Sequence, residues 1–190
     1  VMLKKVMESS KASVELTGGG RFLTEFGLCA PDGKPNTINT IECNNVMQIA
    51  DSEFQSWTYW DSMFFTKDGK PDMKQLMSFS RVYPEATCGI PGTMFFNTTN
   101  GYFKYEFSAV MPAKAAKAMD SSDIPAGFPL LDLFVPEAVH YNGTMRYYIK
   151  ISPVNITYNK LPDSVSTYRF GSSQVIVAET VITVEIIPKE

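Results

Sequence analysis

The alternation of helical and strand-like segments stops near residue 80, and this change constrains the fold more than any other feature of the sequence. Before that point, helical patterns over residues 1–15, about 41–52 and 72–80 alternate with apolar strand patterns over 21–26 and 54–60. Helices that alternate with strands are typical of βα units built around a parallel sheet. We therefore expect βα units in the first part of the chain.

Strand and turn patterns alone follow residue 80. Asn100-Gly101 is a hairpin signal, residues 112–119 are a candidate helical insertion, and residues 121–129 have the composition of a loop. Short strands at this spacing predict an antiparallel β-sandwich, so we place a domain boundary between residues 1–80 and 81–190. β-Branched and aromatic residues predict the strands themselves over residues 92–96, 102–109, 130–135, 146–152, 155–158, 174–178 and 181–187.

The first 80 residues are too short to form a closed parallel sheet. Each strand of such a sheet needs neighbouring strands and a covering helix, and a (β/α)8 barrel takes about 250 residues. The fold class that we expect is thus a remnant of an α/β TIM barrel, comprising its last strands, followed by an all-β antiparallel sandwich. Because the sequence begins at Val1 within a helical pattern, we expect it to be part of a longer chain.

Candidate catalytic residues lie at the ends of the two expected barrel strands. Glu25 closes the apolar strand in Arg-Phe-Leu-Thr-Glu-Phe-Gly, and Trp57 and Trp60 belong to the strand in Ser-Trp-Thr-Tyr-Trp-Asp. The C-terminal ends of barrel strands form the catalytic face of barrel enzymes. A carboxylate beside a tryptophan suits a sugar site, because the carboxylate attacks an anomeric carbon while the indole face stacks on a pyranose.

Each of these residues also has a structural interpretation. Glu25 would equally cap a helix or pair with an arginine. Trp57 and Trp60 are three positions apart and point to opposite faces of a regular strand, so Trp60 is the candidate sugar platform and Trp57 is favoured as a packing residue. Asp61 is a candidate ligand of a sugar hydroxyl or a solvated loop charge.

The sequence resembles clan A glycoside hydrolases, and within them family 5, in several separate stretches. Residues 24–27 (Thr-Glu-Phe-Gly) and 56–60 (Ser-Trp-Thr-Tyr-Trp) are similar to barrel strands seven and eight of that family. Residues 79–89, 133–136 and 140–141 resemble the junction and sandwich domain of endoglycoceramidases and their relatives.

The resemblance implies a retaining β-glycosidase that acts on glycolipids, with Glu25 as its nucleophile and Trp60 and Trp57 as substrate-binding residues. The acid/base glutamate of that family follows barrel strand four, so the missing N-terminal part of the barrel is an implied partner and the chain alone is expected to be inactive. Residues 63–65 (Met-Phe-Phe) suit a rim that contacts membrane lipid. The alternative is a carbohydrate- or protein-binding module or a pseudoenzyme, which carries no catalysis.

The cysteines and the glycosylation sequons indicate in which cellular compartment the protein is found. Cys29 and Cys43 flank the loop after the Glu25 strand and are spaced to close it as a disulfide, although buried free thiols in a cytoplasmic protein remain the alternative. Three Asn-X-Thr sequons favour secretion or an endomembrane or lysosomal lumen; they begin at Asn97, Asn142 and Asn155.

Other classes of function find little support in the sequence. Acidic and basic residues are interspersed and the net charge is −3, which argues against nucleic-acid binding. Neither a metal-ligand spacing nor a phosphate-binding glycine loop is present, so we expect no metal and no cofactor. His140, the single histidine, is expected to have a structural role.

Overall fold

The chain folds into two compact units, Val1–Ser80 and Arg81–Glu190, which we call the N-terminal and C-terminal units and describe separately. The structure is a computed structural model that describes residues 2–27, 29–61, 64–109, 128–141, 146–153, 155–172, 176 and 178–189. Among these residues, no helix is both long enough and apolar enough to span a lipid bilayer.

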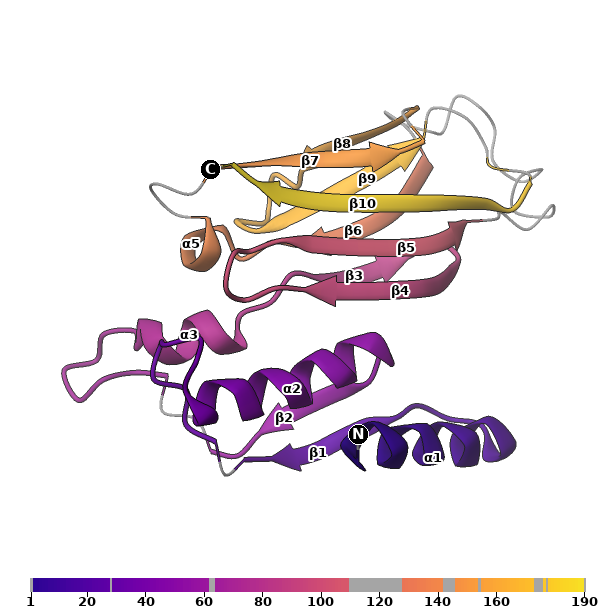
Figure 1. Cartoon of the computed structure of the whole chain (residues 1–190). Coiled ribbons are helices and arrows are strands. Elements are labelled where there is room, and N and C mark those ends of the chain that lie inside the picture. Colours follow the sequence, from indigo (N-terminus) through magenta and orange to yellow (C-terminus); the bar gives the residue numbers. More distant parts are fainter. Residues whose placement is uncertain are drawn as a thin grey trace. The chain divides into compact units, whose positions relative to one another are not determined.

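The N-terminal unit contains a two-stranded parallel sheet with helices (Figure 1). The expected order of helices and strands is present, with α2 beginning at Ile38 instead of residue 41. The Asp72 carboxylate caps α3 by accepting a hydrogen bond of 3.0 Å from the Lys74 amide. The elements are α1 (Met2–Thr17), β1 (Phe22–Phe26), α2 (Ile38–Ser52), β2 (Ser56–Tyr59) and α3 (Met73–Phe79).

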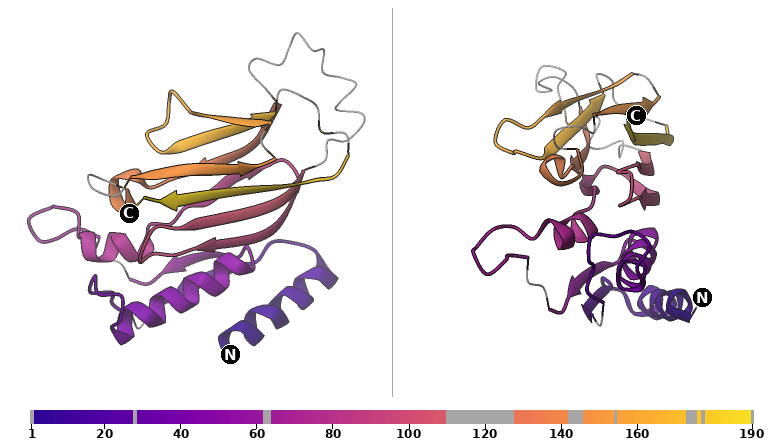
Figure 2. Two further views of the ribbon diagram at one scale, coloured as in Figure 1. Left: turned by 45° about the horizontal axis from the view of Figure 1, so that its top comes forward. Right: turned by 60° about the vertical axis from the view of Figure 1, so that its left-hand side comes forward.

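The described residues of the C-terminal unit form two four-stranded antiparallel sheets, which Figures 1 and 2 show as two layers. The expectation of antiparallel strands is confirmed. One sheet has the order β4-β5-β10-β7, formed by β4 (Ile90–Phe96), β5 (Phe103–Ala109), β10 (Thr180–Pro188) and β7 (Tyr147–Ser152). The other has the order β3-β6-β9-β8, formed by β3 (Tyr83–Thr87), β6 (Phe128–Phe134), β9 (Thr167–Ser172) and β8 (Ile156–Lys160).

Alternation of side chains along the strands produces the core of this unit. In β5, Phe103, Tyr105 and Phe107 are buried while the residues between them are partly exposed. The Tyr105 hydroxyl lies 2.9 Å from the Thr87 hydroxyl of β3, so a buried phenol joins the two sheets by a hydrogen bond. The remaining fully buried side chains include Phe96, Leu131, Leu133, Phe170, Ile182, Val184 and Ile186.

Two strands and one helix of this unit have no counterpart in the sequence-based expectation, and a third strand begins earlier than expected. β3 and β9 were not expected, and neither was the short helix α5 (Glu137–His140). β6 begins at Phe128, within a segment expected to be a loop. The candidate helix at 112–119 lies outside the described residues, as does most of the candidate strand at 174–178.

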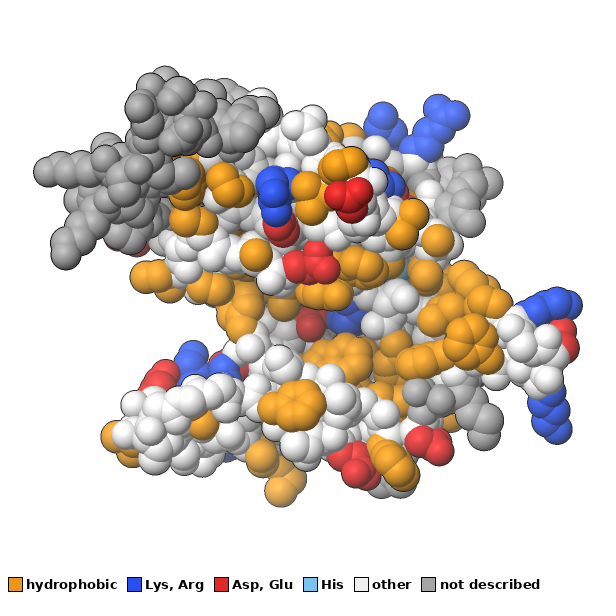
Figure 3. Space-filling model, turned by 180° about the vertical axis from the view of Figure 1, so that it is seen from behind, with side chains coloured by type: hydrophobic (Ala, Val, Ile, Leu, Met, Phe, Trp, Pro, Cys, Tyr) orange, Lys and Arg blue, Asp and Glu red, His pale blue; other side chains and the backbone are white. Residues whose placement is uncertain are grey.

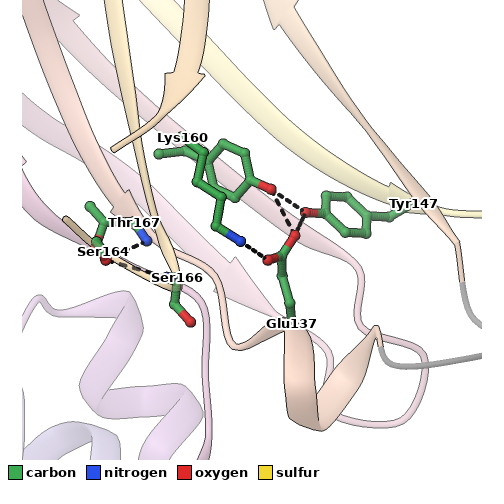
Figure 4. A network of polar contacts seen from close by, with 7 residues as sticks. Glu137, Tyr147, Lys160, Ser164, Ser166 and Thr167 are labelled. Carbon is green, nitrogen blue, oxygen red and sulfur yellow. Dashed lines mark hydrogen bonds and ion pairs between the residues drawn. The ribbon is translucent and has the colours of Figure 1, made fainter. Parts of the chain in front are cut away.

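A polar network ties α5 to three strands of the sandwich (Figure 4). The Glu137 carboxylate accepts hydrogen bonds from the Tyr147 hydroxyl of β7 at 2.5 Å and from the Tyr168 hydroxyl of β9 at 2.7 Å. Lys160 of β8 donates to the other carboxylate oxygen. Burial acts to raise the pKa of Glu137, but the hydrogen bonds from Lys160, Tyr147 and Tyr168 outweigh it and the pKa is lowered.

Replacing Glu137 with glutamine is expected to destabilise the protein at neutral pH by about 1.5–3 kcal/mol, the range for hydrogen bonds to charged groups. Because the folded-state pKa of Glu137 is lowered, its stabilisation is complete above the unfolded-state pKa and is lost as pH falls through the folded-state value. Urea unfolding at about pH 7 and about pH 3 should therefore show the gap between wild type and Glu137→Gln narrowing in acid. A gap of equal size at both pH values would contradict this role.

Candidate functional site

Glu25 lies at the carboxyl end of β1 in a β-bulge. Leu23 pairs with Trp57 and Phe26 pairs with Tyr59, so the span from Leu23 to Phe26 contains one residue more than the facing span of β2. The Glu25 side chain is exposed, as is that of Thr24. Bulges often re-aim a side chain next to an active site, and here two successive side chains are left accessible.

Trp60 follows β2 directly and is fixed to β1 through its backbone. Its amide donates a hydrogen bond of 2.8 Å to the Phe26 carbonyl, and its peptide bond to Asp61 is cis. The indole is 67% exposed, unusually high for so large an apolar group. Because β1 and β2 are parallel, Glu25 and Trp60 come from carboxyl ends at the same edge of the sheet.

A hollow of about 430 Å³ opens beside Trp60, and we call it the Trp60 hollow. Glu25 and Trp57 are not among the residues that line it. Burial and the nearby negative charge of Asp61 raise the pKa of Tyr59, so this lining phenol is a neutral hydrogen-bonding group at physiological pH. The lining residues are Cys29, Ala30, Asn39, Tyr59, Trp60, Asp61 and Gln75.

The sequence did not indicate that Ala30, Asn39 and Gln75 belong to this site. Asn39 comes from the first turn of α2 and Gln75 from α3, so both reach the hollow through tertiary packing. Within the described part of the chain, the buried Oε1 atom of Gln75 has no hydrogen-bond partner. No local sequence signal marks such positions, because a single polar residue on a helix usually faces solvent.

Trp57 lies in an aromatic cluster. Its ring centroid is 5.6 Å from that of Phe26 in an edge-to-face arrangement and 6.4 Å from that of Phe79. The cluster packs around the buried residues Cys29, Cys43, Met47 and Phe79. Trp57 therefore packs against the buried core of the N-terminal unit.

A disulfide links Cys29, just after β1, to Cys43 on α2, with 5.7 Å between the Cα atoms. The Tyr59 hydroxyl donates a hydrogen bond to the Cys29 carbonyl, so the loop is attached to β2 as well as to α2. In the chain-entropy account, a crosslink across 14 residues stabilises the fold by about 3 kcal/mol. The third cysteine, Cys88 in the C-terminal unit, is a free thiol.

The remaining candidate residues lie in the C-terminal unit. His140 is buried, with its ring edge-on to Phe96 at 5.0 Å. Asn97 begins the β4–β5 connection, where its Oδ1 accepts a hydrogen bond of 2.9 Å from the Thr99 amide. Asn155 is exposed just before β8, and Asn142 lies outside the described residues. Glycosylation at these sequons stays a prediction.

The described residues do not meet the requirements of a metal site. Within the described ranges, no three side chains of the His, Cys, Asp or Glu types gather closely enough to hold an ion. The groups that the N-terminal unit presents at this edge of its sheet are an exposed carboxylate, an exposed indole and the polar groups of the Trp60 hollow.

Comparison with known proteins gives matches in sequence and in structure. The model of the glycoside hydrolase family 5 C-terminal domain matches residues 81–186. Endoglycoceramidase I of Rhodococcus hoagii (strain 103S) is 36% identical over 93 residues, which cover 45% of this chain and 16% of that protein.

Two solved structures are similar in fold. Endo-glycoceramidase II from Rhodococcus sp., in complex with a five-membered iminocyclitol, has a TM-score of 0.59 at 16% identity, covering 94% of this chain and 36% of that one. Cryptococcus neoformans sterylglucosidase 1 has a TM-score of 0.64 at 14% identity, and the match covers 98% of this chain and 31% of that one. The chain thus spans about a sixth of the curated relative and about a third of each solved structure.

Proposed function

This chain belongs to glycoside hydrolase family 5, and from that membership we propose that it carries the nucleophile of a retaining β-glycosidase that acts on glycolipids. In this proposal β1 and β2 are the last two strands of a (β/α)8 barrel, with Glu25 and Trp60 on its catalytic face. The fold likeness extends over at least 94% of the chain in both solved structures, which supports a shared order of helices and strands along the chain.

The observation that carries the proposal is the placement of Glu25. It is an exposed carboxylate in a bulge at the carboxyl end of β1, and the neighbouring parallel strand is followed directly by an exposed tryptophan beside a hollow. A retaining glycosidase needs such a carboxylate, together with an apolar face that receives the sugar ring.

The proposed reaction has two steps. In the first, a Glu25 carboxylate oxygen attacks the anomeric carbon while a second carboxylic acid protonates the departing glycosidic oxygen, so a covalent glycosyl-enzyme forms as the glycosidic bond breaks. In the second, that same group removes a proton from water, and the water oxygen displaces Glu25. The two carboxyl groups of retaining enzymes lie about 5–5.5 Å apart.

In this proposal, none of these 190 residues acts as the acid/base. In our assignment it belongs to barrel strand four, which would precede Val1 in a complete barrel. We therefore propose that the isolated chain does not hydrolyse glycosides, because a nucleophile without a proton donor cannot expel an alkoxide at a useful rate.

The lipid part of the substrate is inferred from the names of the relatives and from the surface. Trp60, Phe65, Met73 and Met77 expose large apolar side chains in the N-terminal unit. Figure 3 shows hydrophobic side chains over much of one face, with acidic and basic side chains scattered between them. An apolar surface near a sugar site suits an amphiphilic substrate that is drawn from a membrane or micelle. Met63 lies outside the described residues.

Incubating the complete protein with lactosylceramide, a steryl β-glucoside and cellotetraose tests the substrate class. We expect cleavage of at least one glycolipid at a kcat/KM about tenfold or more above that for cellotetraose, a difference of about 1.4 kcal/mol in transition-state binding. The readout is the release of an intact sugar and an intact aglycone, which mass spectrometry detects.

Cleavage of cellotetraose alone would overturn the lipid assignment. Binding of the glycolipids without turnover would favour the alternative of a non-catalytic module. The isolated 190-residue chain is the matched control, and turnover by it would contradict the assignment of the acid/base to a separate strand.

A further inference from the structure

We propose that Gly27 is a positioning residue, whose missing side chain allows the Trp60 backbone to lie against β1 and so fixes the indole relative to Glu25. The inference rests on the proposed function, because it assigns a role within the same site. It concerns a residue that touches no substrate and acts through Trp60.

The evidence is a close backbone approach. A Cβ atom built on Gly27 would lie 2.1 Å from the Trp60 carbonyl oxygen and 3.3 Å from the carbonyl carbon. Both atoms belong to the main chain, so no flexible side-chain end is available to move aside. Gly27 is not among the glycines with positive φ, which means that close packing and not backbone conformation calls for glycine here.

Hydrogen bonds also hold the backbone around Trp60 against β1. Its amide is bonded to the Phe26 carbonyl at 2.8 Å, and the Thr58 hydroxyl donates to the Thr24 carbonyl. The end of β2 is therefore attached to β1 both within the bulge that carries Glu25 and directly after it. A methyl group at position 27 has to separate the strands at Trp60, and this movement is passed on to the indole and to Asp61.

Such a displacement changes the geometry between nucleophile and sugar platform. Glu25 is two residues before Gly27, on the strand that would have to move relative to Trp60. A misplacement of about 1 Å between reacting groups lowers the rate by roughly 10²-fold, because the bound substrate no longer meets the nucleophile in a near-attack geometry.

The test compares Gly27→Ala with Gly20→Ala in the complete protein, using an aryl β-glycoside. Gly20 lies on the same segment, just before β1, and a Cβ there meets no atom within 4 Å. We expect kcat/KM to fall roughly 10²-fold for Gly27→Ala and to stay within about twofold for Gly20→Ala. Wild-type activity in Gly27→Ala would overturn the inference.

A double-mutant cycle separates positioning from damage to the fold. If Gly27 acts through the indole, Gly27→Ala should cost less than about fivefold in a Trp60→Ala background, because the group it positions has been removed. An equal loss in both backgrounds would identify a structural role and overturn the inference.

Thr58→Val provides the test should Gly27→Ala not fold. This isosteric change removes the Thr58 hydroxyl, which is not part of the Trp60 hollow, and loosens the same strand end. We expect a loss of about fivefold that disappears in the Trp60→Ala background, and a loss that persists there would contradict positioning. Activity in Glu25→Gln would instead refute the proposed function, so the two failures are distinguishable.

Discussion

Replacing Glu25 with glutamine should lower kcat of the complete protein by roughly 10⁴-fold or more, the scale observed when the nucleophile of a covalent mechanism is removed. Glutamine keeps the size of the side chain and one acceptor oxygen, but it replaces the other oxygen with an NH2 donor and carries no anion to attack the anomeric carbon. Because Glu25 is exposed in its bulge, the substitution leaves no buried group without a partner, and the thermal midpoint should change little. Steady-state hydrolysis of an aryl β-glycoside measures the effect.

Glu15→Gln is the matched control for this experiment. Glu15 is also exposed and lies on α1 of the same unit, so the variant makes the same change in charge and leaves the strand ends untouched. Its activity should equal that of the wild type. Activity of Glu25→Gln within tenfold of Glu15→Gln would be incompatible with a nucleophilic role.

Replacing Gly89 with alanine should produce the largest loss of stability, roughly 3–5 kcal/mol, from the sum of backbone strain and overpacking. Gly89 connects β3 of one sheet to β4 of the other and has a φ of +143°. A Cβ atom there would lie 2.1 Å from the Ser108 carbonyl oxygen on β5. Differential scanning calorimetry of the complete protein should show the transition of the mutated unit lowered by roughly 10 °C or more.

Gly20→Ala again serves as the comparison, since a Cβ atom at position 20 lies in open space and the φ angle there is not positive. It should change the unfolding free energy by less than about 1 kcal/mol. Equal thermal midpoints for Gly20→Ala and Gly89→Ala would show that β5 and the β3–β4 connection move apart easily, contrary to the packing described above.

The sequence predicted most strands and helices because their signals are local. Alternating burial in β5 and the β-branched, apolar run of β10 are visible in the residues themselves. β3 was missed because Pro84 interrupts its pattern, yet β3 is at the edge of its sheet, where a residue without an amide hydrogen is tolerated. β9 was missed because Arg169 and Gly171 are untypical of a central strand. In the structure, Arg169 forms a bidentate ion pair with Asp132 of β6.

The candidate site was predictable only in part, for a related reason. Glu25 and Trp60 are recognisable from their position after strand-forming residues. The bulge at Glu25 depends on how β1 pairs with β2, and the close approach of Gly27 to Trp60 depends on the separation of the two strands. Both are properties of a pair of segments, so the residues of either segment alone do not reveal them.

Covalent trapping tests the assignment of Glu25 most directly. In a 2-deoxy-2-fluoro β-glycoside the fluorine slows both steps of a retaining mechanism, while an activated leaving group restores the rate of the first, so the glycosyl-enzyme accumulates. After proteolysis of the complete protein, we predict that peptide mass spectrometry will find the fluorosugar on the peptide containing Thr24–Gly27, attached to Glu25. A label on any other carboxylate, with Glu25 unmodified, would contradict the account.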